Sequence, residues 1–193
     1  MSKSLHSISP IDGRYFSKVS ELSEFFSEFA LIKYRIRVEI EYLIALSEGP
    51  LSFELSKLKE KKSELREIYN SFDLKDAEQV KVYEKKINHD VKAVEYFIKQ
   101  KLEDLGLIKS KEYVHFGLTS QDINNTSIPL SLKEALSVVL IPQLEVLTEE
   151  LKKISKSWWG ITMLARTHGQ AASPTNLGKE IAVFVERLNN QIG

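Results

Sequence analysis

The spacing of apolar residues is the feature that most constrains the fold of this chain. Near its start, apolar positions follow one another at alternating steps of three and four, which places them on one face of a long α-helix. They are Leu22, Phe25, Phe29, Ile32, Ile36, Ile40 and Leu43. Gly49 and Pro50 are typical of residues that end such a helix. The period-two alternation of a half-buried strand is nearly absent, so the sequence predicts an all-α fold.

Further helices are predicted from the same pattern and from turn residues. They cover residues 53–70, 73–86, 91–105, 119–156 and 177–192. Pro142 lacks a backbone donor and should kink or restart the fourth of these helices. Residues 157–176 are expected to form a longer connection, because they contain turn residues and little periodicity.

Two domains are expected: a small N-terminal helical domain over residues 1–110, and the first part of a long-helix bundle over residues 111–193. In the second part, leucines and isoleucines repeat at the three-four rhythm of bundle packing. The last predicted helix runs to Gly193, and nothing follows that could cover its apolar face. We therefore expect the sequence to be the opening of a larger bundle.

Composition limits the kinds of partner. Lysine plus arginine and aspartate plus glutamate both number 27, so the chain as a whole has no field to hold nucleic acid or an anionic membrane. With no cysteine there is no disulfide and no thiolate metal site, which fits a reducing compartment. The start lacks the apolar core of a secretory signal, and no apolar run approaches the ~20 residues of a membrane helix. A cytoplasmic protein is expected.

Three of the four histidines lie in polar breaks between predicted helices, within residues 88–90, 115–120 and 166–170. Histidine titrates near neutral pH and is suited to proton transfer, and polar turns are where binding and catalytic groups collect. The pattern indicates an enzyme site assembled from separate segments.

Each segment also has a purely structural interpretation. Asn88 is a plausible N-cap, which would put His89 and Lys92 in a first helical turn that favours an anion, or would merely cap a solvated helix. Thr119 and Asp122 fit a capping box. The run of hydroxyl and amide side chains that begins at Thr119 exceeds what a cap needs, and the surplus could bind a carboxylate or phosphate.

The segment from Arg166 to Gln170 is the sharpest of the three. Gly169 permits backbone conformations closed to other residues and could fix His168 in an unusual turn; a loop histidine bonded to backbone is the alternative. Arg14 follows an Asp-Gly turn and is either solvated or a phosphate ligand. No His-x-x-x-His pair supports a metal site, and no Gly-rich phosphate loop supports nucleotide binding of that kind.

Taken together, four segments resemble the adenylosuccinate lyase family of the fumarase/aspartase superfamily. In chain order they are Ser9–Tyr15, Asn88–Glu95, His115–Asn125 and Arg166–Gln170. The last two are shared in looser form across the superfamily, while the first two argue for the purine family in particular. The resemblance covers the whole chain.

The resemblance implies a lyase that releases fumarate from adenylosuccinate and from the succinyl-carboxamide ribotide of purine synthesis, without metal or cofactor. It implies that His168 is the general acid that protonates the departing nitrogen. The substrate-binding residues that it implies are Arg14 and Tyr15 for the phosphate, Asn88, His89 and Asp90 for orientation, Lys92 as an electrostatic partner, Thr119 and Ser120 for the succinyl carboxylates, and Thr167 and Gln170 beside the acid. His89 and His168 are then expected to converge on one polyanionic ligand, across neighbouring protomers where necessary.

Members of this family are longer and form homotetramers whose active sites combine residues of several subunits. Their mobile loop, with the signature Gly-Ser-Ser-x-Met-Pro-x-Lys-x-Asn, supplies the serine base and has no counterpart in this sequence. We therefore expect this stretch alone to be inactive. Two alternatives stay open at this point: another fumarate-releasing lyase, of the argininosuccinate lyase or aspartase type, and a non-catalytic helical assembly module.

Overall fold

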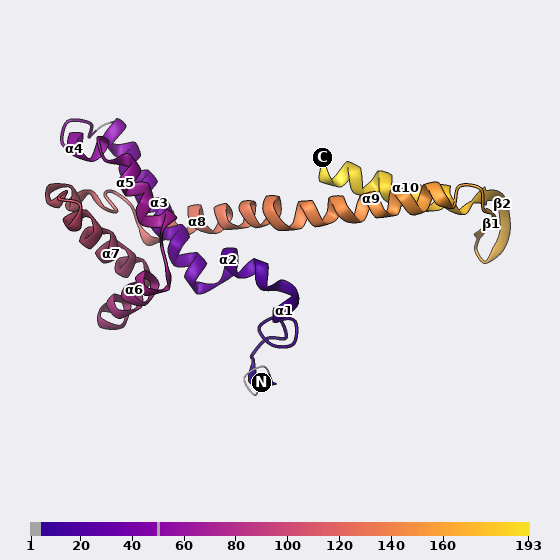
Figure 1. Ribbon diagram of the computed structural model, residues 1–193, viewed down its shortest axis with the longest axis horizontal. Helices are drawn as coiled ribbons and strands as arrows, with labels where there is room; N and C mark the ends of the chain where they lie inside the picture. The colour runs from indigo at the N-terminus through magenta and orange to yellow at the C-terminus, as the bar shows by residue number, and fades with distance from the viewer. Residues whose placement is uncertain (1–4, 50) are drawn as a thin grey trace. The chain divides into compact units, whose positions relative to one another are not determined.

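The computed structural model describes residues 5–49 and 51–193, and the chain forms two compact units (Figure 1). The first unit extends to Glu134 and the second is Ala135–Gly193. The elements are helical apart from one two-stranded hairpin, which confirms the predicted fold class. The division of the whole protein into domains at residue 110 stays a prediction.

The first unit contains eight of the α-helices in the described residues. They are α1 (Phe16–Val19), α2 (Ser23–Phe26), α3 (Glu28–Glu48), α4 (Ser56–Lys59), α5 (Lys62–Asn70), α6 (Leu74–Ile87), α7 (Asp90–Asp104) and α8 (Ser120–Ala135). The helix predicted from Leu22 onward therefore starts later than expected. Ser27 has an extended backbone, and its side chain accepts the N–H of Ala30, so a cap separates α2 from α3.

Helix α3 lies at the centre of the first unit and contacts α5, α6 and α7. Its apolar stripe supplies Ile32, Ile36, Ile40 and Leu43 to a core that also includes Phe97 of α7. The helix ends at Glu48 with Gly49 as its C-cap, while Pro50 lies outside the described residues. Helix α7 ends before Gly106, whose φ is +74°, as the sequence predicted.

The second unit is built from two helices and a hairpin. A five-residue π-helical segment, Leu136–Leu140, leads into α9 (Ile141–Ser157), which has Pro142 in its first turn. The predicted kink or restart at this proline is found as a π-helical interruption of the α-helix, and the backbone of Leu140 and Ile141 remains helical. Helix α10 (Leu177–Ile192) packs along α9 (Figure 1). A Cβ on Gly178 would lie 2.3 Å from the carbonyl oxygen of Ser155, so only glycine allows this close approach.

Residues 157–176 are not the plain connection that the sequence predicted. They include the antiparallel strands β1 (Thr162–Thr167) and β2 (Gln170–Asn176), with an irregular register between Leu164 and Arg166. Both strands are largely exposed on both faces. Since no face is buried, no period-two apolar pattern is required, and the sequence shows none. In the described part of the chain, no helix has both the length and the apolar character needed to cross a bilayer.

Candidate active site

Three non-glycine residues in the described chain have positive φ, and each lies in one of the three histidine segments: Asn88 (52°), His115 (61°) and His168 (51°). A left-handed backbone is uncommon for residues other than glycine, although Asn and His adopt it more often than most. Such conformations persist where the surroundings hold them, and they cluster at functional sites. The backbone therefore marks the same three segments that the side-chain chemistry indicated.

Asn88 and His89 each cap one of the two helices that meet at the junction of α6 and α7. Asn88 is the left-handed C-cap of α6, and His89 is the N-cap of α7, with its Nδ1 accepting the N–H of Lys92 at 3.1 Å. The predicted N-cap at Asn88 is therefore wrong by one residue, because asparagine tolerates the left-handed conformation that ends α6. Lys92 does lie in the first turn of α7, as expected.

The charged side chains at the start of α7 are paired with buried groups. The carboxylate of Asp90 forms an ion pair with the guanidinium of Arg35 on α3, with 2.8 Å between Oδ2 and Nη2. Burial opposes ionisation of Asp90, but the N–H of Val91 and the guanidinium of Arg35 outweigh it and lower its pKa. Lys92 contacts the carboxylate of Glu95 at 2.7 Å, which raises the pKa of Lys92.

His115 was not among the predicted binding residues. Its side chain is nevertheless more buried than those of the histidines in the other two segments, His89 and His168. Its Nδ1 lies 2.5 Å from Oε1 of Glu39 on α3, and its Nε2 lies 3.9 Å from Oε1 of Glu95 on α7. Glu39 is fully buried, and burial raises its pKa against the opposing effect of His115. Oε2 of Glu39 has no hydrogen-bond partner among the described residues.

Thr119 and Ser120 lie at the start of α8, as predicted. Asp122 accepts both the N–H and the hydroxyl of Thr119, at 2.7 and 3.0 Å, and these bonds lower the pKa of Asp122. This is one half of the predicted capping box. Two residues further along α8, the Asn124 side chain accepts from Nε of Arg35 at 3.0 Å.

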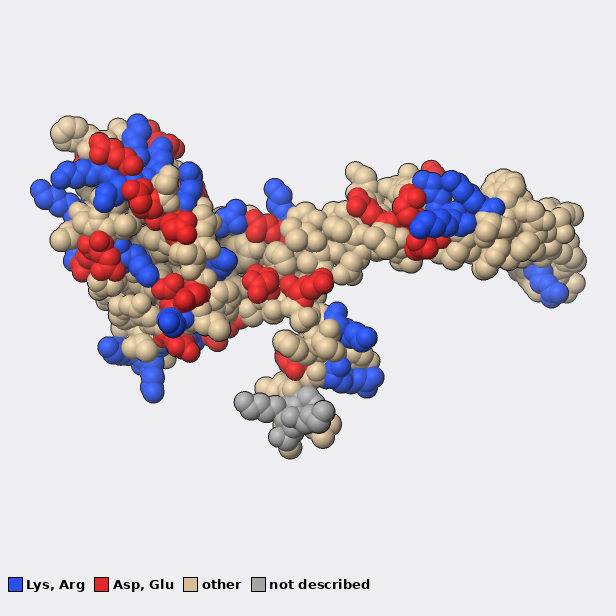
Figure 2. Space-filling view, in the orientation of Figure 1, with Lys and Arg blue, Asp and Glu red and all other residues tan. Residues whose placement is uncertain are grey.

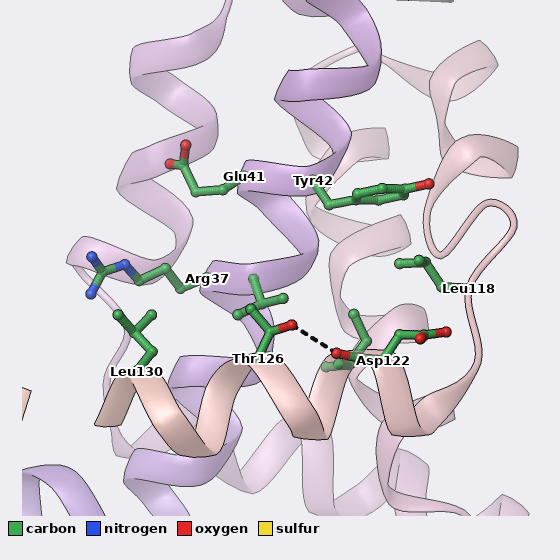
Figure 3. A pocket seen from close by; sticks show the side chains of 9 residues that line it. Arg37, Glu41, Tyr42, Leu118, Asp122, Thr126 and Leu130 are labelled. Atoms are coloured by element: carbon green, nitrogen blue, oxygen red, sulfur yellow. Dashed lines mark hydrogen bonds between the residues drawn. The ribbon is translucent and has the colours of Figure 1, made fainter. Parts of the chain in front are cut away.

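A cavity of about 360 Å³ adjoins this helix start (Figure 3). Arg37, Glu41 and Tyr42 of α3 line one side, and Asp122 and Thr126 of α8 line the other. The hydroxyl of Thr126 donates to the backbone oxygen of Asp122, drawn as the dashed line in Figure 3. This side chain of the cavity wall is therefore held by a bond within α8 itself.

Arg14 and Tyr15 are exposed and contact each other. The Arg14 guanidinium donates to the Tyr15 hydroxyl at 2.8 Å and lies 4.5 Å from its ring centroid. This arrangement presents an arginine fork and a phenol side by side, and both groups can hydrogen-bond a phosphate.

His168 and Gly169 form the two-residue turn of the hairpin, between the paired residues Thr167 and Gln170. Both turn residues have positive φ, as type I′ hairpin turns require, so the unusual turn predicted at Gly169 is confirmed. Within the described part of the chain, the exposed imidazole of His168 has no hydrogen-bond or ion-pair partner. It is displayed at the tip of a hairpin that belongs to the second unit.

The structure thus brings some of the predicted residues together. Arg35 connects Asp90 with Asn124, and so joins the second and third motifs inside the first unit. Arg14 and Tyr15 form a separate pair, and His168 lies in the second unit. Sequence reasoning missed Arg35 and Glu39. The spacing places Arg35 and Glu39 on one side of α3, but no feature of the local sequence identifies them as buried.

Charge is mixed on the surface. On the face shown in Figure 2, Lys and Arg intermingle with Asp and Glu, as the equal totals of both signs suggest. The described residues include no group of three or more His, Asp or Glu side chains placed to share a metal ion.

Sequence relatives agree with the resemblance read from the motifs. A protein named adenylosuccinate lyase from Dictyostelium discoideum is 54% identical over 97% of this chain, and the match covers 41% of that protein. Adenylosuccinate lyases from Legionella pneumophila (strain Corby) and Escherichia coli (strain K12) are 42% and 40% identical, over 95% and 97% of this chain and 41% and 42% of theirs. The chain spans about two fifths of the length of these curated relatives.

Solved structures share the fold at lower identity. A fumarate lyase from Mesorhizobium sp. BNC1 superposes with a TM-score of 0.68 at 18% identity, covering 90% of this chain and 38% of that one. The β-carboxy-cis,cis-muconate cycloisomerase of Acinetobacter calcoaceticus sp. ADP1 gives 0.65 at 22% identity, over 90% and 39%. The family profile described as "Lyase" matches residues 13–193, so the chain belongs to the lyase family.

Proposed function

We propose that this chain is part of an adenylosuccinate lyase, which eliminates fumarate from adenylosuccinate and from the succinyl-carboxamide ribotide of purine synthesis. The observation that carries the proposal is the match to adenylosuccinate lyases, at 40–54% identity, over almost the whole chain. All three histidine segments lie inside the region matched by the lyase profile.

The chemistry of these substrates fits the side chains available. Each carries a phosphate of about −1.5 to −2 charge and two carboxylates, so binding requires several cationic and hydrogen-bonding groups. The Arg14 and Tyr15 pair would hold the phosphate, and Thr119 with Ser120 would contact the succinyl carboxylates. Asn88, His89, Asp90 and Lys92, at the junction of α6 and α7, would orient the substrate.

Elimination needs one proton removed from carbon and one supplied to the leaving nitrogen. His168 would supply the second proton, because histidine is the side chain that most often acts as a general acid and the turn presents it where a substrate nitrogen could come within hydrogen-bond reach. Thr167 and Gln170 flank it on the hairpin and would contact the same substrate. Removing the first proton builds negative charge beside a carboxylate, which fixed donors and cations must stabilise.

The proposed site is completed by other copies of the chain. The hairpin carrying His168 and the junction carrying His89 belong to separate compact units, and a homotetramer with shared active sites would allow them to act on one substrate. A cytoplasmic enzyme that uses no metal or cofactor is part of the same proposal.

A direct assay tests the proposal. The complete natural polypeptide that contains this sequence should release fumarate from adenylosuccinate, followed by absorbance, and should not release it from argininosuccinate or aspartate. Release from argininosuccinate alone would favour another lyase of the superfamily. Release from none of the three would leave the non-catalytic assembly module as the better interpretation.

A substitution separates the same alternatives. Arg14→Ala should raise KM for adenylosuccinate by about tenfold or more, because a charge-assisted bond to phosphate contributes about 1.5–3 kcal/mol. Glu21→Gln, on an exposed carboxylate close by in the chain, is the control and should leave KM unchanged. An unchanged KM in Arg14→Ala would contradict the phosphate role.

A further inference from the structure

Helix α3 carries none of the predicted site residues, yet its central turn has an unusual charge pattern. Arg35, Arg37, Glu39 and Glu41 alternate with apolar residues at every second position. In a helix, residues four apart share a face, so Arg35 with Glu39 and Arg37 with Glu41 lie on nearly opposite sides. The two pairs therefore cannot both lie on one face of α3.

The buried pair is Arg35 and Glu39. Their residues are 7% and 1% exposed, whereas the side chains of Arg37 and Glu41 are 36% and 38% exposed. Charged residues are almost never fully buried unless they are paired, because removal from water is costly. Both buried residues are paired, and each contacts a segment with proposed substrate-binding residues.

Arg35 contacts two motifs at once. Its terminal nitrogen lies 2.8 Å from Asp90 at the start of α7, and its Nε donates to Asn124 of α8 at 3.0 Å. The planar guanidinium has donors in a fixed fork, so these two bonds set the distance and angle between the two helix starts.

Glu39 acts one helical turn further along α3. Its Oε1 holds Nδ1 of His115, a residue with φ of 61°, four residues before Thr119. The other ring nitrogen of His115 is directed toward Glu95, which holds Lys92 at 2.7 Å. This chain of contacts again connects the segment before α8 with the first turn of α7.

Stability alone does not account for this arrangement. Replacing a buried ion pair by apolar side chains of similar volume is often neutral or stabilising. Here one carboxylate oxygen of Glu39 is also left without a partner among the described residues. Isoleucine or leucine, which make up most of the other buried positions of α3, would avoid both penalties but could not fix the orientation of polar groups.

We propose that Arg35 and Glu39 are positioning residues, which lock the His89–Lys92 turn and the His115–Ser120 segment into one substrate-binding surface. Neither touches the substrate: Arg35 acts through Asp90 and Asn124, and Glu39 acts through His115. The role in catalysis rests on the proposed function, whereas the mechanical link between the two segments does not.

The test uses matched variants of the complete natural polypeptide. Arg35→Met and Glu39→Met are the inward variants. Lys33→Met and Glu48→Met, at less buried charged residues of the same helix that do not line the cavity of Figure 3, are the outward variants. Amide hydrogen exchange, read by mass spectrometry on peptides covering residues 88–92 and 115–120, reports the mechanical link. We expect the inward variants to exchange about tenfold faster in both segments, and the outward variants to match the wild type.

Kinetics report the consequence for substrate binding. For both inward variants we expect KM for adenylosuccinate to rise about tenfold while kcat stays within about threefold, as for lost ground-state binding. Glu39→Gln keeps the volume and one oxygen to accept from His115, so it should restore KM to within about threefold of wild type.

Several results would overturn the proposal. They are unchanged exchange in both segments, equal changes in the inward and outward variants, or a Glu39→Gln variant as impaired as Glu39→Met. If the Met variants do not fold, Glu39→Gln and Glu39→Asp decide instead, because the shorter side chain withdraws from His115 and only it should accelerate exchange. If wild type releases no fumarate, the proposed function fails, and exchange still tests the link.

Discussion

The two units of the chain hold their proposed site residues in different ways. In the first unit, Asp90 is paired with the buried Arg35 of α3, and Thr119 is bonded to Asp122 in the first turn of α8. In the second unit, all of which is described, Ala135 and Val185 are the buried apolar residues, and His168 lies exposed at a hairpin tip. The first unit positions its polar groups by its own fold, whereas the second presents one group on a regular turn.

The largest effect is expected where the second unit presents its histidine. His168→Asn should lower kcat by about 10²–10⁴, the usual contribution of a general acid. Asparagine followed by glycine is the preferred type I′ turn, so the hairpin should be retained. Fumarate release and thermal unfolding should be measured together, with Met163→Leu on the adjoining strand β1 as control. A kcat near that of wild type would reject the acid role.

The next largest effect is the loss of stability expected when the apolar core of the first unit is disrupted. Phe97 is 0% exposed and packs edge-on against Phe72, with ring centroids 5.8 Å apart. Phe97→Ala should lower the free energy of unfolding by about 3–5 kcal/mol. Phe53→Ala makes the same chemical change at a residue that is 89% exposed and should have little effect. Equal urea midpoints for the two variants would show that the first unit lacks the core described.

The helices of both units and the turn at His168 could be predicted from the sequence. The three-four repeat located the helices, and the glycine after His168 indicated the turn, because both signals are local. The hairpin strands could not be predicted, since neither face is buried and β-propensity depends on what a strand packs against.

The contacts of Arg35 and Glu39 in the first unit could not be predicted from the sequence, for another reason. Arg35 and Glu39 lie in a helix whose charges give no local sign of burial, and their partners are distant in the chain. Arg35 contacts Asn124, 89 positions away in the chain, and Glu39 contacts His115, 76 positions away. No local sequence pattern indicates pairs at such separations. The roles of Arg14 and Tyr15 are implied by the resemblance alone, and in the structure the two side chains contact each other.

A smaller effect concerns how the second unit holds together with so little core. Gly178→Ala would place a Cβ 2.7 Å from backbone atoms of Trp159 and closer still to Ser155, so α10 must move away from α9. We expect a loss of about 1–3 kcal/mol, as for overpacking. Gly160→Ala is the matched control, because no atom lies within 4 Å of its Cβ. Proteolysis at the α9–α10 pair that is equal in both variants would mean that the close approach is not needed.

The smallest effect tests whether a proposed binding segment of the first unit also stabilises the fold. Bonds from Thr119 lower the pKa of Asp122, so its contribution is present above the unfolded pKa and is lost as pH falls through the folded pKa. Asp122→Asn should therefore melt below wild type at pH 7, and the gap should close on acidification. Glu145→Gln, on an exposed carboxylate of α9, should show no such gap. A gap that persists or widens in acid would mean that ionised Asp122 does not hold Thr119, and the ordered start of α8 would need another cause.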